Sequence, residues 1–164
     1  MARPITHDPS LRCPGRGANS NAAGRFEGLE RQYDPDAPGD APMRTDVSVE
    51  HPRTLISYNR SPDLPFDRSI NPYRGCEHGC IYCFARPTHA WLGMSPGLDF
   101  ESRLIARPEA ATVLERELRA PRYRVAPLAI GTNTDPYQPL EGRYDVTRSC
   151  LKVLDRFNHP VAIV

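Results

Sequence analysis

FESRLIARPEAATVLERELR, residues 100–119, places an apolar extended run directly before an amphipathic one. The opening residues of this stretch predict a strand. Pro108 then stands at a favourable first helical position, because the first turn of a helix does not use the N–H that proline lacks. The expected helix has an apolar face: Val113, Leu114 and Leu118. The stretch therefore predicts a strand followed by a helix, the basic unit of an α/β fold.

The same pattern recurs toward the end of the chain. PLAIGTNTD contains a short apolar strand at residues 128–130 and leads into the polar loop GTNTDPYQPLEGR. A helix is predicted from about Asp145, a residue type that favours the N-cap. Its apolar face has helical spacing: Cys150, Val153, Leu154 and Phe157. PVAIV, residues 160–164, begins another strand, and DRSINPYRGC, residues 67–76, is an extended segment ending in a turn.

Alternating strands and helices imply parallel pairing through right-handed crossovers. For residues 61–164 we expect an α/β fold, an incomplete β/α (TIM-like) barrel of about four parallel strands. Residues 1–60 are rich in Pro, Gly and Arg, with few regularly spaced apolar residues. They predict an extended or disordered N-terminal arm, anchored at Phe26 and at the run Leu55-Ile56.

Charge is nearly balanced, with 21 basic and 20 acidic side chains, and all the basic residues except Lys152 are Arg. This balance does not indicate a nucleic-acid or membrane-surface partner. No apolar run approaches the roughly 18 residues that span a bilayer, and the N-terminus lacks the apolar centre of a secretory signal. We expect a cytoplasmic protein, in which crowded cysteines more often bind metal than form disulfides.

Three of the five cysteines lie in GCEHGCIYC, residues 75–83. Thiolates are soft ligands that select zinc, copper(I) or iron-sulfur clusters. The glycines before the first and second cysteines allow the backbone to curl, so that Cys76, Cys80 and Cys83 can converge on one centre. A structural zinc or an electron-transfer cluster normally takes four protein ligands. Three thiolates leave one coordination position open for chemistry.

Other interpretations of the cysteines remain. A helix predicted from Ile81 to about Leu92 places Cys80 and Cys83 on one helical face. These two cysteines can form a redox pair that leaves Cys76 spare, or all three cysteines can be inert. In a zinc-stabilised interaction module without catalysis, His78 or His89 supplies the fourth ligand.

Longer strings around the cysteines carry a family resemblance. NPYRGCEHGCIYCFARPTHAWLGMSPGLDF, GTNTDPYQPLE, the leader strings GRGANSN and GRFE, and PVAIV together resemble the radical S-adenosylmethionine superfamily, in a bacterial branch related to spore photoproduct lyase whose substrate is unassigned. The resemblance implies that Cys76, Cys80 and Cys83 hold three irons of a 4Fe-4S cluster, with S-adenosylmethionine on the fourth. It further implies an enzyme that generates a 5′-deoxyadenosyl radical, which abstracts hydrogen from an unknown substrate, and an electron donor such as a flavodoxin or ferredoxin.

The resemblance also names cofactor-binding positions. Tyr82 matches an aromatic residue near the adenine, while Thr134 or Asp135 is expected to bind the amino group or ribose of S-adenosylmethionine, with Glu141 a weaker candidate. For each of these loop residues the alternative is a turn capped by Asp135. No residue is assigned a catalytic role.

Two departures from the family pattern limit what the resemblance implies. GTNTD has no cysteine to return hydrogen to a product radical, so thymine-dimer repair by that route is not expected, and Cys150 is expected in the core. The chain also matches only the N-terminal part of such enzymes, so we expect a truncated domain. Four arginines near the cysteines can receive a phosphate or be solvated: Arg74, Arg86, Arg103 and Arg107.

Overall fold

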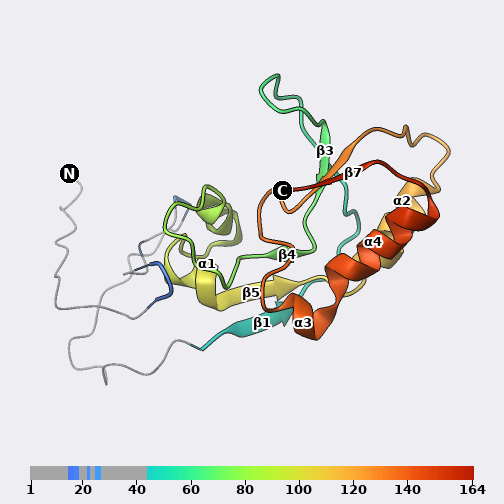
Figure 1. The fold of residues 1–164 in the computed structure, drawn as a ribbon. Helices are drawn as coiled ribbons and strands as arrows, with labels where there is room; N and C mark the ends of the chain where they lie inside the picture. Colours follow the sequence, from blue (N-terminus) through green and yellow to red (C-terminus); the bar gives the residue numbers. More distant parts are fainter. Residues whose placement is uncertain (1–14, 19–21, 23–24, 27–43) are drawn as a thin grey trace, which may run out of the picture.

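The computed structural model describes residues 15–18, 22, 25–26 and 44–164, and its strands form two small sheets (Figure 1). The strands of the first sheet, in spatial order, are β1 (Asp46–Val49), β5 (Arg103–Ala106) and β4 (Tyr73–Arg74). Those of the second are β2 (Ser57–Tyr58), β3 (Arg68–Ile70), β6 (Leu128–Ile130) and β7 (Val161–Ile163). Both sheets mix parallel and antiparallel pairs.

The helices are short. They are η1 (Arg86–Leu92, a 3₁₀-helix), α1 (Leu98–Ser102), α2 (Ala110–Leu118), α3 (Glu141–Tyr144) and α4 (Val146–Arg156). In Figure 1 the two longer helices, α2 and α4, run side by side, away from the segment that carries α1. Glu115 links the two helices, because its carboxylate accepts hydrogen bonds from Arg119, at the end of α2, and from Arg156 of α4.

The main core lies between these helices and the sheets. It contains Leu114 and Leu118 of α2, Val153 and Leu154 of α4, and the fully buried strand β6. The predicted strands at residues 128–130 and within 160–164 are confirmed, as are the predicted helices that became α2 and α4. Apolar residues predicted these elements: α2 and α4 each bury one face and β6 is buried along its length, whereas β7 is exposed.

The expected barrel of parallel strands is wrong. After β3, the chain turns at Asn71-Pro72 and β4 pairs antiparallel to β5, with Tyr73 opposite Ala106. The parallel neighbour of β5 is β1, which lies in the range assigned to the N-terminal arm. Meanwhile β3 pairs in parallel with β6. Strands that alternate with helices along the chain are therefore divided between two sheets instead of following one another around a barrel.

Local differences have clear causes. The predicted helix from Ile81 is wrong over its first residues, which form turns, and Pro87 opens the 3₁₀-helix η1 instead. The strand predicted from residue 100 begins only at Arg103, because α1 occupies the preceding residues.

The start of α4 also differs from the prediction. Asp145 has a left-handed φ of 52°, and its side chain makes no capping hydrogen bond within the described chain. Glu141 replaces it, since its carboxylate accepts the backbone N–H groups of Thr147 and Arg148 at 2.9 and 3.0 Å. The same carboxylate accepts the Tyr73 hydroxyl. Glu141 thus has a structural role in this fold.

Part of the N-terminal arm can be compared with its prediction. Leu55 and Ile56 are buried in the main core, which confirms them as anchoring points, and the Phe26 ring lies 4.5 Å from that of Trp91. The strands β1 and β2 fall within residues 44–60. Most of the remaining arm, Cys13 included, lies outside the described residues.

Candidate functional site

The cysteine loop, residues 75–83, leaves β4 and curls through two left-handed glycines. Gly75 has a φ of 76° and Gly79 a φ of 62°. A Cβ at Gly75 would lie 2.8 Å from the Phe100 carbonyl oxygen and 2.7 Å from a Leu104 methyl group. Both conformation and space therefore require glycine there. The backbone N–H of Cys76 donates to the same Phe100 carbonyl at 2.9 Å, which ties the start of the loop to α1.

The three thiols of the loop are free and differ in exposure. Cys76 is buried beside Ala85 and Phe100, with Cys83 packed against this cluster, and Cys80 and Cys83 are half-buried. Burial raises the pKa of the Cys76 thiol, while hydrogen bonds from the backbone N–H groups of His78 and Asp135 oppose this shift. These N–H groups would stabilise a thiolate.

The cysteine loop has the ligand types of a metal site but not its compact geometry. Three thiols on one loop suit a soft metal or an iron-sulfur cluster in their chemistry. In the described part of the chain, however, no three side chains of the His, Cys, Asp or Glu type are grouped closely enough to hold a metal ion. Binding such a group would therefore require the loop to draw its sulfurs together.

A second loop, between β6 and α3, holds the cysteine loop in place. The Thr134 hydroxyl donates to the Gly75 carbonyl at 2.6 Å, and the Gln138 amide donates to the same carbonyl at 3.1 Å and to the Thr134 hydroxyl at 2.9 Å. The Gln138 carbonyl accepts the backbone N–H of Glu77 at 3.1 Å. Both side chains are buried. The two loops thus meet through Thr134 and Gln138. The sequence analysis did not single out Gln138, although it lies within the quoted polar string.

Asp135 lies where this second loop meets His78. One carboxylate oxygen accepts the backbone N–H of Tyr137 at 2.7 Å, as expected if Asp135 caps a turn. The other carboxylate oxygen lies 3.4 Å from His78 Nε2. Tyr82, the predicted adenine neighbour, is 85 % exposed beside Cys83. Ile81 of the loop and Phe84, the residue directly after it, are also exposed. The loop therefore presents an apolar surface next to its thiols.

The arginines near the loop have partners. Arg74 and Arg107 both donate to Glu50, whose carboxylate lies 2.9 Å from Arg74 Nε. Arg103 lies near Asp99, at 3.9 Å. Arg86 donates to the Cys80 carbonyl through two nitrogens, at 3.1 and 3.0 Å. Each of the four arginines therefore has a partner within the chain, and no contact among the described residues favours a phosphate-binding role for them.

His89, a candidate fourth ligand, lies in the interior next to Gly75. Its Nε2 is 3.0 Å from the Arg103 carbonyl and therefore carries the proton that it donates. Its Nδ1 has no hydrogen-bond partner within the described residues. Burial lowers the pKa of this imidazole, so the neutral ring with a bare Nδ1 is the favoured form.

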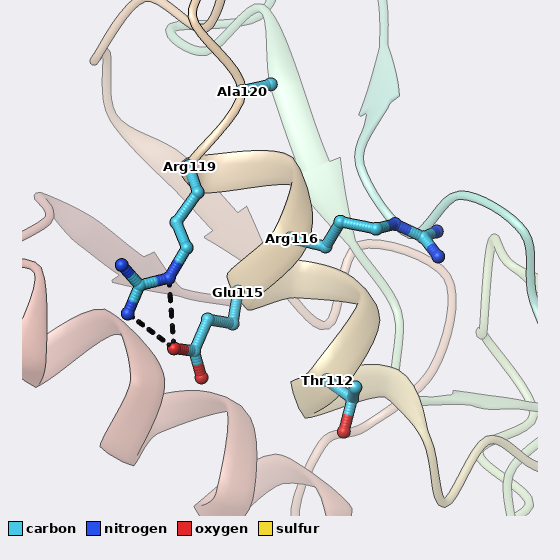
Figure 2. Close-up of a pocket in the computed structure, with 5 residues that line it drawn as sticks. All are labelled: Thr112, Glu115, Arg116, Arg119 and Ala120. Atoms are coloured by element: carbon cyan, nitrogen blue, oxygen red, sulfur yellow. Dashed lines mark hydrogen bonds and ion pairs between the residues drawn. The ribbon is translucent and has the colours of Figure 1, made fainter.

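One hollow lies away from the cysteines. It is a shallow depression on and just beyond α2, lined by Thr112, Glu115, Arg116, Arg119 and Ala120 (Figure 2). Figure 2 shows Arg119 turned toward Glu115 and Arg116 pointing away from both. Arg116 donates to the Arg53 carbonyl. The charged side chains of this hollow therefore have partners within the chain: Glu115 pairs with Arg119 and Arg156, and Arg116 donates to a main-chain carbonyl.

These features define a mixed α/β protein whose cysteine loop is held between α1 and the β6–α3 loop. The chain is similar to proteins of Mycobacterium bovis and of two Mycobacterium tuberculosis strains, each called an uncharacterized protein, at 46 % identity over 127 residues. The match covers 76 % of this chain, and the chain spans 37 % of the length of these curated relatives. No protein-family model and no solved structure matches the chain.

None of the described helices combines the length and the apolar character needed to cross a membrane.

Proposed function

We propose that this chain is the cysteine-loop part of an iron-sulfur enzyme of the radical S-adenosylmethionine type, acting in the cytoplasm. Cys76, Cys80 and Cys83 would be the ligands of a 4Fe-4S cluster. The observation that carries the proposal is a loop of three free thiols, curled by two left-handed glycines and held at Gly75 by Thr134 and Gln138. With S-adenosylmethionine, the cluster would supply a 5′-deoxyadenosyl radical for hydrogen abstraction.

The residues of the chain would have distinct tasks in this function. The N–H groups of His78 and Asp135 stabilise the Cys76 thiolate, which a cluster needs because thiolates, not thiols, ligate metal. Thr134 uses its hydroxyl to orient the loop, so its contribution is to positioning. Exposed Tyr82 stands free to contact a bound cofactor. An electron donor such as a flavodoxin or ferredoxin would reduce the cluster.

The test is anaerobic reconstitution of the full chain with iron and sulfide. We expect about four irons and four sulfides per chain, with a reduced-state resonance that S-adenosylmethionine perturbs. Cys80→Ala should lose the iron. Cys150→Ala is the matched control, because this thiol is wholly buried in the main core. Equal iron loss in both variants would contradict the ligand assignment.

One observation favours a second function, a zinc-stabilised interaction module. His89 offers a buried Nδ1 without a hydrogen-bond partner among the described residues, on a ring whose Cε1 lies close to Gly75, and neutral imidazole is an able zinc ligand. His78 is less suited, since its Nε2 faces Asp135. A colourless protein with one zinc per chain, which His89→Phe releases and Cys150→Ala keeps, would support this module and exclude the cluster.

A further inference from the structure

Glu101 of α1 is a completely buried carboxylate at the centre of contacts to the cysteine loop. Three successive backbone N–H groups of the leader donate to it: Arg16 at 2.7 Å, Gly17 at 3.1 Å and Ala18 at 2.8 Å. The Arg16 guanidinium also donates to the Glu101 main-chain carbonyl at 2.6 Å. Successive N–H groups that converge on one anion form a concave anion site. The leader segment 16–18 is thus bound to α1 by this carboxylate.

On its other side, Glu101 reaches the loop through Arg86. The Arg86 guanidinium pairs with Glu101 at 2.5 Å and donates through two nitrogens to the Cys80 carbonyl. A buried carboxylate is costly unless it is paired and hydrogen-bonded, and Glu101 satisfies this requirement with Arg86 and the leader together. The position of the Cys80 backbone therefore depends on the same carboxylate that binds the leader.

The leader also touches the loop directly. A Cβ built on Gly17 would lie 1.8 Å from the Gly79 carbonyl oxygen, and one on Gly79 would lie 2.5 Å from the Arg16 Cβ. Only glycine allows these two backbones to approach so closely. The turn before Cys80 is consequently held from one side by segment 16–18 and from the other by Arg86.

We propose that Glu101 is the positioning residue of the cysteine loop. It sets the place of the Cys80 to Cys83 turn through Arg86 and closes segment 16–18 over Gly79, which limits access of solvent and reagents to these thiols. The inference concerns the loop itself; its importance for a cluster rests on the proposed function.

The experiment compares alkylation of individual cysteines by iodoacetamide in the metal-free full chain, read by mass spectrometry. Glu101→Gln should speed labelling of Cys80 and Cys83 by about tenfold, because local opening becomes easier. Cys150 reports global unfolding in the same sample, and its labelling rate should not change. Glu115→Gln is the control, since the Glu115 carboxylate is also paired with arginine but lies on α2.

A second variant tests the same inference independently, in case Glu101→Gln does not fold. Gly17→Ala leaves Glu101 intact and forces segment 16–18 away from Gly79, so it should also speed labelling of Cys80 without affecting Cys150. If both variants label these thiols at the wild-type rate, or if Cys150 accelerates equally in both, the inference is overturned.

The cluster provides a separate readout. If wild-type protein binds iron, Glu101→Gln should shift the reduced-state resonance and shorten the half-life of the cluster in air. If wild-type protein binds no iron while the labelling changes occur, the proposed function fails and the positioning role of Glu101 stands.

Discussion

Replacing Gln138 with leucine tests whether the β6–α3 loop holds the cysteine loop. Leucine retains the approximate volume of Gln138 but removes its three hydrogen bonds, two donated by the amide and one accepted from Glu77 N–H. The Gly75 carbonyl keeps Thr134 as a donor, so the main cost is the unpaired N–H of Glu77, about 1–3 kcal/mol, plus about 1 kcal/mol for each lost donation. We expect the free energy of unfolding to fall by at least about 3 kcal/mol, the lower end of this sum.

Urea denaturation followed by circular dichroism measures this change, and a loss of this size should lower the melting temperature by about 6–12 °C. Thr134→Val should cost about 1 kcal/mol, because Gln138 still donates to Gly75. The control is Tyr137→Leu, at an exposed neighbouring position, with an expected change within about 0.5 kcal/mol. If Gln138→Leu also stays within that range, the two loops do not depend on each other as described.

Three further predictions concern other parts of the structure, and urea denaturation tests each of them. Burial raises the pKa of Cys150 to about 12, so the neutral thiol stabilises the fold below pH 9, and this stabilisation is lost as pH rises toward 12. The decrease in the free energy of unfolding caused by Cys150→Ala should therefore become smaller by about 1.4 kcal/mol between pH 7 and pH 10. A decrease that is the same at both pH values would contradict the raised pKa. Glu141→Ala should cost about 2 kcal/mol through lost capping of α4, whereas Asp145→Asn should have little effect, and the reverse order would restore Asp145 as the cap. Burial tends to raise the pKa of Glu50, but Arg74 and Arg107 lower it overall, so the stabilisation that the Glu50 carboxylate provides is lost as pH falls below 4.5. In Glu50→Gln the free energy of unfolding should therefore decrease less with falling pH than in the wild-type protein. The same pH dependence in both proteins would argue against the pairing of Glu50 with the two arginines.

Elements with a continuous apolar face were predictable. The strand at residues 128–130 and the helices that became α2 and α4 bury those faces in the core, and their spacing alone indicates it. The meeting of the polar loop with the cysteine loop was also predictable, because residues 131–138 directly follow a buried strand. The contacts inside the site were not: a buried Gln138 or Glu101 resembles any surface polar residue in sequence.

The sequence by itself determined which segments could be strands or helices and which loop carries the thiols, because periodicity, glycines and ligand chemistry are local properties. Only the tertiary structure decided how the strands pair. The turn at Asn71-Pro72 directs β4 antiparallel to β5, and β1 joins β5 although 53 residues, 50–102, lie between the two strands. Pairing depends on which distant edges bury apolar surface together, and an alternation of strands and helices does not contain that information.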